Sequence, residues 1–260
     1  MPDFARNDVS LHYELVGTGR PLLLIAGTAS DGASWGPLLE RLPGRQLILI
    51  DNRGSGRTKV DGPLSHADMV ADCAALLDHL GLGPVDVVGH SLGGFLGLFL
   101  AALHPDKVSR LATMGSGLID AKTRVLFQDL SQLYFTIPPE AFFRLLYQWL
   151  FSTPFFENAD ALAAAARAST DYAYRQSPGD FARQIAAMDR PLQVDFSTIA
   201  CPVLAIAAEH DLLAPPTSVA LAHAPIAEHE MTTIEDAAHS MHWEQPDAVA
   251  AAIVDFLQGR

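Results

Sequence analysis

Short apolar runs recur along the chain, separated by longer stretches of helical character. The runs span residues 21–26, 46–50, 85–88 and 202–207. Runs of this length without polar alternation are typical of strands buried on both faces of a parallel sheet. Before them, Val9–Val16 alternates roughly between apolar and polar residues and is followed by Gly17, which predicts an early strand and a turn.

Three stretches between or after these runs predict helices. Residues 64–80 follow a helical period, with Ser65 as the expected N-cap and Gly81 just past the end. Leu92–Leu103 is almost wholly apolar and predicts a buried helix, and Pro246–Leu257 predicts a closing amphipathic helix. Strands that alternate with helices in this way predict an α/β fold with a doubly wound, mostly parallel sheet.

Residues 118–197 interrupt this alternation. They are rich in helix formers, lack a clear buried strand and carry ten aromatic residues between Phe127 and Phe156. We expect them to form a helical cap inserted into a core made of residues 1–117 and 198–260. An apolar substrate pocket and the cap's own hydrophobic core explain these aromatic side chains equally well, and the sequence leaves both interpretations open.

Composition and charge exclude several classes of function. The 260 residues are 49% hydrophobic and 18% charged, which is typical of a globular protein. The net charge of −13 opposes binding to nucleic acid or to an anionic membrane surface, and no apolar stretch is long enough to predict a membrane span. The two cysteines, Cys73 and Cys201, match no disulfide framework or metal-ligand spacing, and residues 1–6 lack a secretion pattern. Together these features favour a cytoplasmic protein.

The strongest chemical signal lies at residues 89–93, which read Gly-His-Ser-Leu-Gly. This Gly-x-Ser-x-Gly motif stands between the apolar run at 85–88 and the predicted helix Leu92–Leu103, which is the context that a nucleophile elbow requires. A sharp turn from strand to helix projects the serine hydroxyl from the sheet, and the start of the helix supplies positive potential for a developing oxyanion. We therefore expect Ser91 to be a catalytic nucleophile, although a serine that merely caps the helix would fit the bare motif.

With this motif the chain resembles the α/β-hydrolase family, and the resemblance covers nearly all of it. The matching features, in the family's order, are Gly27 after the third strand, Asp-Asn-Arg-Gly-Ser-Gly at 51–56, the Ser91 motif, Glu-His-Asp at 209–211 and Ala-His at 238–239. The resemblance implies a sheet of about eight strands. It also implies that Asp51 and Arg53 are structural, because their loop is mainly structural in the family.

A serine hydroxyl needs a general base, and the resemblance assigns this role to His239. His239 follows the predicted strand at 230–234 and precedes Glu-Gln-Pro at 244–246, as the catalytic histidine does in family members. His242 is the nearby alternative. His90 adjoins Ser91, but its side chain should point away from the nucleophile, so we expect it to be structural or to line the pocket.

The acid that orients the base is expected to be Asp211. It follows the apolar run at 202–207 and produces the order serine, aspartate, histidine that is typical of this fold. Asp120, after the sixth strand, is the alternative, because some family members carry their acid there. A simple turn or cap aspartate would also fit the pattern around Asp211.

Acyl transfer also needs hydrogen-bond donors for the tetrahedral oxygen. We expect these to be the backbone N–H groups of Leu92 and Thr28, with Ala29 as the neighbouring possibility. The chain departs from the family here, since Ala26 stands where a histidine usually precedes Gly27. A backbone donor tolerates that change.

The resemblance implies a serine hydrolase that acts on an ester, lactone or thioester of an apolar small molecule, with no cofactor and no metal. Cleavage of a carbon–carbon bond and cofactor-free perhydrolysis use the same triad and remain alternatives, as does a non-catalytic ligand-binding protein of this fold. A serine at the elbow argues against the branches with an aspartate nucleophile. A homodimer is compatible with the sequence.

We expect the substrate to contact two side chains besides Ala29. They are His90 and Trp149. The sequence shows no arginine cluster suited to a strongly anionic substrate, but one of three arginines in the cap region could contact a single carboxylate. These arginines are Arg124, Arg144 and Arg167.

Overall fold

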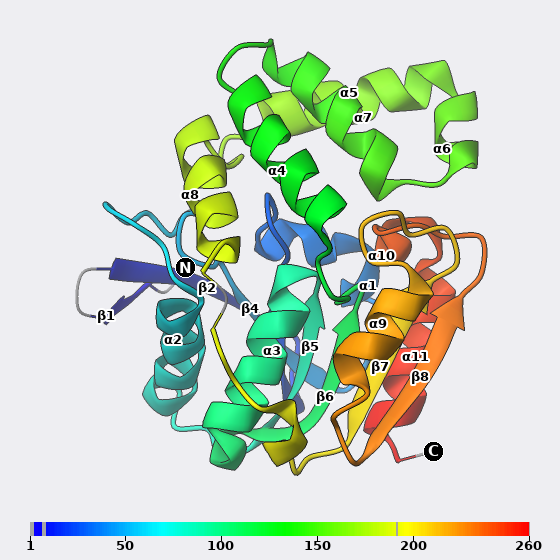
Figure 1. The fold of residues 1–260 in the computed structure, drawn as a ribbon. Helices are drawn as coiled ribbons and strands as arrows, with labels where there is room; N and C mark the ends of the chain where they lie inside the picture. The colour runs from blue at the N-terminus through cyan, green and yellow to red at the C-terminus, as the bar shows by residue number, and fades with distance from the viewer. Residues whose placement is uncertain (1–2, 7–8, 191, 260) are drawn as a thin grey trace.

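A computed structural model describes residues 3–6, 9–190 and 192–259, so Met1 and Pro2 of the N-terminal stretch lie outside the described residues. The described chain forms one eight-stranded sheet flanked by helices (Figure 1). The strands are β1 (Asp3–Arg6), β2 (Val9–Val16), β3 (Arg20–Ile25), β4 (Arg45–Ile50), β5 (Val85–His90), β6 (Val108–Met114), β7 (Val203–Ala208) and β8 (His229–Ile234). They pair in the order β1-β2-β4-β3-β5-β6-β7-β8.

The sheet is mostly parallel, as predicted. Only the pairs β1–β2 and β2–β4 are antiparallel among the described strands. Because all six strands from β3 onward run in one direction, their carboxyl ends meet at one edge of the sheet, where α/β proteins place their ligands.

Helices cover both faces of the sheet. Those of the core are α1 (Gly36–Leu39), α2 (His66–His79), α3 (Leu92–Leu103), α9 (Pro216–His223), α10 (Met241–Glu244) and α11 (Pro246–Leu257). Alternate residues of β3 pack on opposite faces: Leu23 lies in the hydrophobic cluster with α2 and α3, whereas Leu24 lies in the cluster with α1 and α11. This two-sided burial explains why the strands read as continuous apolar runs.

The predicted core helices agree with the structure. Leu92–Leu103 and Pro246–Leu257 are observed with the predicted bounds, and α2 occupies most of the predicted range 64–80. The Ser65 hydroxyl accepts a hydrogen bond from the N–H of Asp68, as expected of an N-cap. Among the helices of the described chain, none is both long and apolar enough to cross a membrane.

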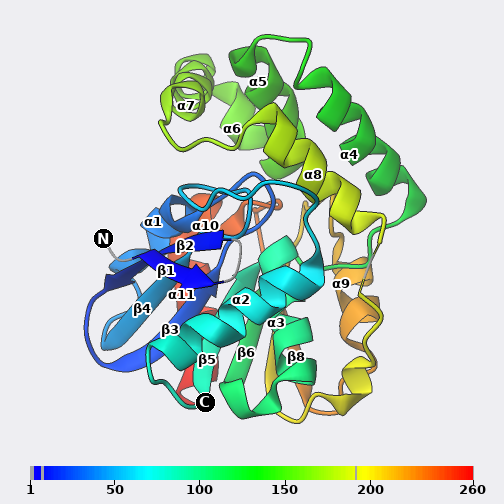
Figure 2. The same ribbon diagram turned by 90° about the vertical axis from the view of Figure 1, so that its left-hand side faces the viewer.

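Five helices between β6 and β7 lie beyond the carboxyl ends of the strands, at the top of Figure 1 and again in Figure 2. They are α4 (Ala121–Leu133), α5 (Pro139–Leu150), α6 (Thr153–Glu157), α7 (Ala159–Asp171) and α8 (Pro178–Met188). Their apolar faces form a separate hydrophobic cluster in which Phe142 and Phe181 are fully buried. Leu213 from the core joins this cluster, so the helical layer shares apolar packing with the rest of the molecule.

The turn from β5 into α3 is packed closely enough to require glycine. A Cβ on Gly93 would lie 1.9 Å from the carbonyl oxygen of Ile25, and one on Gly89 would lie 2.2 Å from the carbonyl oxygen of Gly93. Backbone atoms of β3 and α3 cannot move aside cheaply, because both elements are buried.

We expect Gly93→Ala to lower the free energy of unfolding by about 3 kcal/mol, since overpacking forces the backbone apart. Gly36→Ala is the matched control: Gly36 is also helical, and nothing lies within 4 Å of its added Cβ. It should leave stability unchanged or raise it by up to about 1 kcal/mol. Urea unfolding of both variants measures the difference, and equal stabilities would contradict the close packing described for this turn.

Candidate active site

Ser91 lies in a strained backbone conformation at the junction of β5 and α3. Its φ of 54° and ψ of −117° are rare for a residue that carries a side chain. Hydrogen bonds hold the residue on both sides: its N–H donates to the carbonyl of Met114 at 2.7 Å, and its own carbonyl accepts from the Ser116 hydroxyl at 2.9 Å. The neighbouring strand β6 therefore supports the conformation predicted for a nucleophile elbow.

His239 and Asp211 form a buried pair. Nδ1 of His239 lies 2.8 Å from Oδ2 of Asp211, and the two side chains are 5% and 0% exposed. The other carboxylate oxygen, Oδ1, accepts from the backbone N–H groups of Leu213 and Ala214, each at 2.8 Å. An ionised carboxylate only accepts hydrogen bonds, so the His239 proton resides on Nδ1 and leaves Nε2 free to accept a proton.

The electrostatics favour an ionised Asp211. Burial by itself raises the pKa of Asp211, but the nearby His239 and the hydrogen bonds from His239, Ala214 and Leu213 outweigh it and lower the pKa below its ordinary value. A negative charge therefore persists beside the imidazole at neutral pH and would stabilise an imidazolium.

The structure brings this pair to the same end of the sheet as Ser91. Gly115 directly follows Met114, the residue whose carbonyl binds the Ser91 N–H. A Cβ on Gly115 would lie 3.1 Å from Nδ1 of His239 and 3.3 Å from Oδ2 of Asp211. Nucleophile, base and acid candidates thus surround the carboxyl end of β6, although they come from three distant parts of the chain.

The alternative base and acid are placed differently. His242 is 2% exposed and lies among rings: it packs against His90 and Trp35 at centroid distances of 4.7 and 5.7 Å. No described carboxylate is paired with it. Asp120 is exposed and caps α4 by accepting from the N–H of Thr123 at 2.7 Å. Neither residue is part of a histidine–carboxylate pair.

The loop after β3 lies against the nucleophile. A Cβ on Gly27 would lie 3.1 Å from Cβ of Ser91, so this loop passes close to the elbow. Ala29 has a φ of 61°, which turns the chain sharply after Thr28. The Thr28 hydroxyl is buried without a hydrogen-bond partner in the described chain. Leu92 is the first residue of α3 and is buried.

A cavity of about 730 Å³ separates the core from the cap helices. Thr28 and Ala29 line it, as does Ser240, the residue after His239. Its walls are mostly apolar and include rings from the cap. These are Tyr134, Phe142, Phe143, Tyr147, Phe151 and Phe155. The same rings pack on one another, with Tyr134 stacked on Phe142 at 3.7 Å, so the aromatic residues serve both the cap's own core and the cavity wall.

Two residues predicted as substrate contacts have other surroundings than the cavity. His90 does not line the cavity, because its Nε2 is turned to the carbonyl of His239 at 2.9 Å and its ring is buried against His239 and His242. Burial and His239 lower the pKa of His90 to about 3, so it stays neutral. Trp149 does not line the cavity either, since it packs in the cap cluster with Lys122 over its ring at 5.7 Å.

The arginine in the cavity wall is not one of the three that the sequence suggested. None of the three predicted arginines lines the cavity, and Arg124 instead donates to the carbonyl of Met188. Arg175 is the arginine in the cavity wall. Nothing in its local sequence pattern distinguishes it from the others, because only the fold of the cap decides which side chain faces inward.

Three further polar residues near the site were not predicted from the sequence. Glu244 accepts from the N–H of Ala238 at 2.7 Å and from the N–H of Ser152 at 2.9 Å, so it ties the His239 loop to the cap. Its place in the Glu-Gln-Pro motif was the available signal. Asp31 and Tyr172 also face the cavity and had no such signal.

The polar residues of the loop after β4 have structural contacts. Arg53 forms a buried ion pair with Asp72 at 2.5 Å, and Asp51 accepts from the N–H of Gly32 and Arg57, both at 2.9 Å. Away from the cavity, Glu209, His210 and Asp236 bring possible metal-ligand atoms within 4.8 Å of one another, but all three are exposed.

Comparison with known proteins gives consistent relatives. A protein from Azorhizobium caulinodans named "Putative carbamate hydrolase RutD" is 37% identical over 147 residues, so the match spans about half of each chain, 55% of this one and 56% of that one. A Mycobacterium tuberculosis protein named "Putative non-heme bromoperoxidase BpoC" is 29% identical over 96% of this chain and 98% of its own. The solved enol-lactonase from Burkholderia xenovorans has a TM-score of 0.87 at 25% identity, covering 99% of this chain and 100% of that one.

The family itself is shown by the match to a family model. The model of the alpha/beta hydrolase fold matches residues 20–246, which run from β3 to the start of α11 and include the elbow and the histidine–aspartate pair. The sheet order, the elbow and this match agree, and the chain belongs to the α/β-hydrolase family.

Proposed function

We propose that the protein hydrolyses a carboxylic ester or lactone of an apolar small molecule, with Ser91, His239 and Asp211 as its catalytic triad. The observation that carries the proposal is the buried His239–Asp211 pair, 2.8 Å apart, near the strained Ser91 turn. Ser91 and His239 are not among the residues that line the cavity, but their neighbours are: Thr28 in the loop against the elbow, and Ser240 after His239. A thioester would react by the same steps.

The first half of the reaction forms an acyl-enzyme. Oγ of Ser91 attacks the substrate carbonyl while Nε2 of His239 removes its proton, and Asp211 stabilises the resulting imidazolium. The carbonyl oxygen becomes an oxyanion that accepts from the N–H groups of Leu92 and Thr28. When the carbonyl re-forms, the bond to the leaving alkoxide breaks and His239 returns the proton to it, which releases the alcohol.

The second half repeats this chemistry with water. His239 removes a proton from a water molecule as its oxygen attacks the acyl carbon. The bond to Ser91 breaks, the serine recovers its proton from His239, and the carboxylic acid leaves. No metal or cofactor takes part in these proposed steps.

The apolar character of the substrate is supported by the cavity walls. Rings of the cap surround a volume in the range of small-molecule sites, and such pockets bind mainly through apolar contact with few polar groups. Perhydrolysis is a second candidate, favoured by the bromoperoxidase name of the relative that aligns over 96% of this chain. Hydrogen peroxide would then replace water in the second half and release a peracid.

We expect Ser91→Ala to lower kcat on p-nitrophenyl butyrate by roughly 10⁴-fold or more, because the variant cannot form the acyl-enzyme. A fluorophosphonate probe should label the natural protein and not this variant. Ser109→Ala is the control, since Ser109 lies at the opposite end of β6 from the site. Equal turnover by Ser91→Ala would refute the assignment of the nucleophile.

We expect Asp211→Asn to reduce kcat by roughly 10⁴-fold, because an amide cannot hold the His239 proton on Nδ1 or stabilise the imidazolium. Asp120→Asn should stay within about threefold of the natural protein, since Asp120 caps α4 at the surface. Steady-state kinetics on both variants decide between the two acids. A larger loss in Asp120→Asn would reassign the acid.

A separate experiment tests perhydrolysis, the second candidate function. In acetate buffer with hydrogen peroxide and bromide, acetic acid would acylate Ser91 with loss of water and hydrogen peroxide would release peracetic acid. The peracid should oxidise bromide to hypobromous acid, which brominates monochlorodimedone, and Ser91→Ala should abolish this reaction. Bromination that is absent, or equal in both proteins, would reject the second candidate and leave ester hydrolysis standing.

A further inference from the structure

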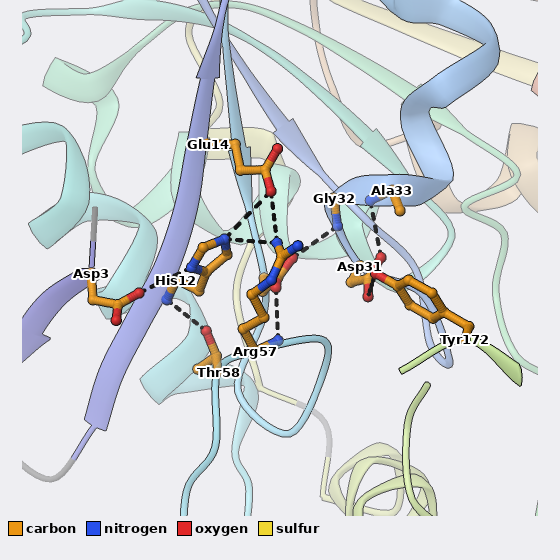
Figure 3. A network of polar contacts seen from close by, with 10 residues as sticks. Asp3, His12, Glu14, Asp31, Gly32, Ala33, Arg57, Thr58 and Tyr172 are labelled. Atoms are coloured by element: carbon orange, nitrogen blue, oxygen red, sulfur yellow. Dashed lines mark hydrogen bonds and ion pairs between the residues drawn. The ribbon is translucent and has the colours of Figure 1, made fainter. Parts of the chain in front are cut away.

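A carboxylate from the core meets a tyrosine from the cap in the cavity wall. Asp31 follows the loop after β3, and its Oδ1 accepts from the N–H of Ala33 at 2.9 Å. Its Oδ2 accepts from the Tyr172 hydroxyl, also at 2.9 Å, although 141 residues separate the two in sequence. Figure 3 shows the two side chains turned toward each other across the junction. Both residues line the cavity.

Asp31 forms no ion pair with a cation of the described chain. It is only 6% exposed. Arg57, the nearest cation in Figure 3, pairs with Glu14 at 2.6 Å and stacks over the Tyr174 ring at 4.2 Å. Burial and the repulsion of Asp51 raise the pKa of Asp31 by more than the hydrogen bonds from Tyr172 and Ala33 and the charge of Arg57 lower it. An unpaired carboxylate in an apolar wall is costly, and such groups gather at binding sites.

The rest of the cavity wall adds negative charge. Its other charged residues are Asp236, Glu244 and Arg175, so three carboxylates face one guanidinium. Nη1 of Arg175 donates to the carbonyl of Thr170, whereas its buried Nε has no hydrogen-bond partner in the described chain, so Arg175 keeps its charge and offsets one of the three carboxylates. With a net charge of −13 on the whole chain, the cavity attracts cations and repels anions.

Asp31 and Tyr172 also have unused hydrogen-bonding capacity. Each carboxylate oxygen can accept two hydrogen bonds, and the contacts with Ala33 and Tyr172 occupy one position on each. The Tyr172 oxygen donates to Asp31 and can still accept. An ammonium group has several N–H donors, so one group could donate to Oδ2 of Asp31 and to the Tyr172 oxygen together. The face of the Tyr172 ring offers further cation–π stabilisation.

We propose that Asp31 and Tyr172 form a subsite for a primary or secondary ammonium group on the substrate. This inference rests on the proposed function and narrows it to esters or lactones that carry a cationic end. Asp31 lies three residues beyond Thr28, so its Cα is at most about 10 Å from that proposed oxyanion donor. This upper bound allows a substrate whose ammonium group and ester carbonyl are separated by about five or six bonds.

Three p-nitrophenyl esters of one chain length test the subsite. They are the 6-aminohexanoate, the heptanoate and the hydrogen adipate esters, whose ends are cationic, neutral and anionic. We expect kcat/KM to be about tenfold higher for the cationic ester than for the neutral one, the gain of one hydrogen bond to a charged group. The anionic ester should be the poorest substrate. Equal values for all three, or a preference for the anion, would overturn the proposal.

Asp31→Asn removes the charge and keeps the shape. The amide oxygen can still accept from the Ala33 N–H, and the amide nitrogen can donate to the Tyr172 oxygen. We expect the cationic preference to fall about tenfold, with kcat/KM on the neutral ester within threefold. The matched control is Asp129→Asn, an exposed carboxylate on cap helix α4 that does not line the cavity, which should leave the preference unchanged within twofold.

Tyr172→Phe distinguishes ligand binding from a purely structural link between core and cap. It breaks the hydrogen bond to Asp31 but keeps the carboxylate, so part of the cationic preference should survive. If Tyr172→Phe and Asp31→Asn instead lose activity on all three esters equally, the pair only joins the cap to the core and the subsite is refuted.

Binding to Ser91→Ala separates this inference from the proposed function. Calorimetry should show tighter binding of heptylammonium than of heptan-1-ol, with the difference lost when Asp31→Asn is added. If no ester is hydrolysed but this difference is found, the subsite stands and the hydrolase proposal fails. If esters are hydrolysed and heptylammonium binds no better than heptan-1-ol, the hydrolase stands and the subsite fails.

Discussion

The site depends on the close approach of backbone segments at the turn from β5 into α3. Ser91 sits there in a conformation that a free chain avoids, and its N–H and carbonyl are tied to the end of β6 and to Ser116. Gly89 and Gly93 allow the turn to pack against α3 and β3 without a side chain between them. The strain is tolerated because the buried sheet surrounds the turn, and local strain of this kind persists only where its environment overdetermines it.

Neutral and charged groups are separated around this turn. His90 and His242 are buried next to His239, and burial lowers the pKa of both, so they add no positive charge near this proposed base. The ionised Asp211 contacts only one of the three rings, that of His239, among the ring contacts and ion pairs of the described chain. The surroundings thus concentrate the stabilisation of an imidazolium on a single histidine.

The cap contributes to the site through polar links as well as through its rings. Gln176 donates to the carbonyl of Gly54 at 2.8 Å, and Glu244 accepts from Ser152 of the cap and from Ala238 of the histidine loop. These links lie near the cavity, together with the hydrogen bond from the Tyr172 hydroxyl to Asp31. The histidine loop and the cap are therefore joined twice, through Glu244 and through the N–H of Ser240, which donates to the carbonyl of Leu150 at 2.8 Å.

The sequence by itself determined the features that depend on near neighbours. Continuous apolar runs identified the buried strands, helical periodicity identified α3 and α11, and the Gly-x-Ser-x-Gly motif between a strand and a helix identified the Ser91 turn. The resemblance to a known family pointed to His239 and Asp211, which no local pattern pairs, since 28 residues separate them.

Only the tertiary structure decided which side chains face the cavity. Helices of the cap present several aromatic and charged residues at similar spacing, and packing alone turns Trp149 and Arg124 away while it brings Arg175 and Tyr172 to the wall. The contact of Tyr172 with Asp31 joins residues 141 positions apart on different layers. A sequence pattern records which face of a helix is apolar, but it does not record which distant segment that face will meet, because the match depends on the summed packing of the whole fold.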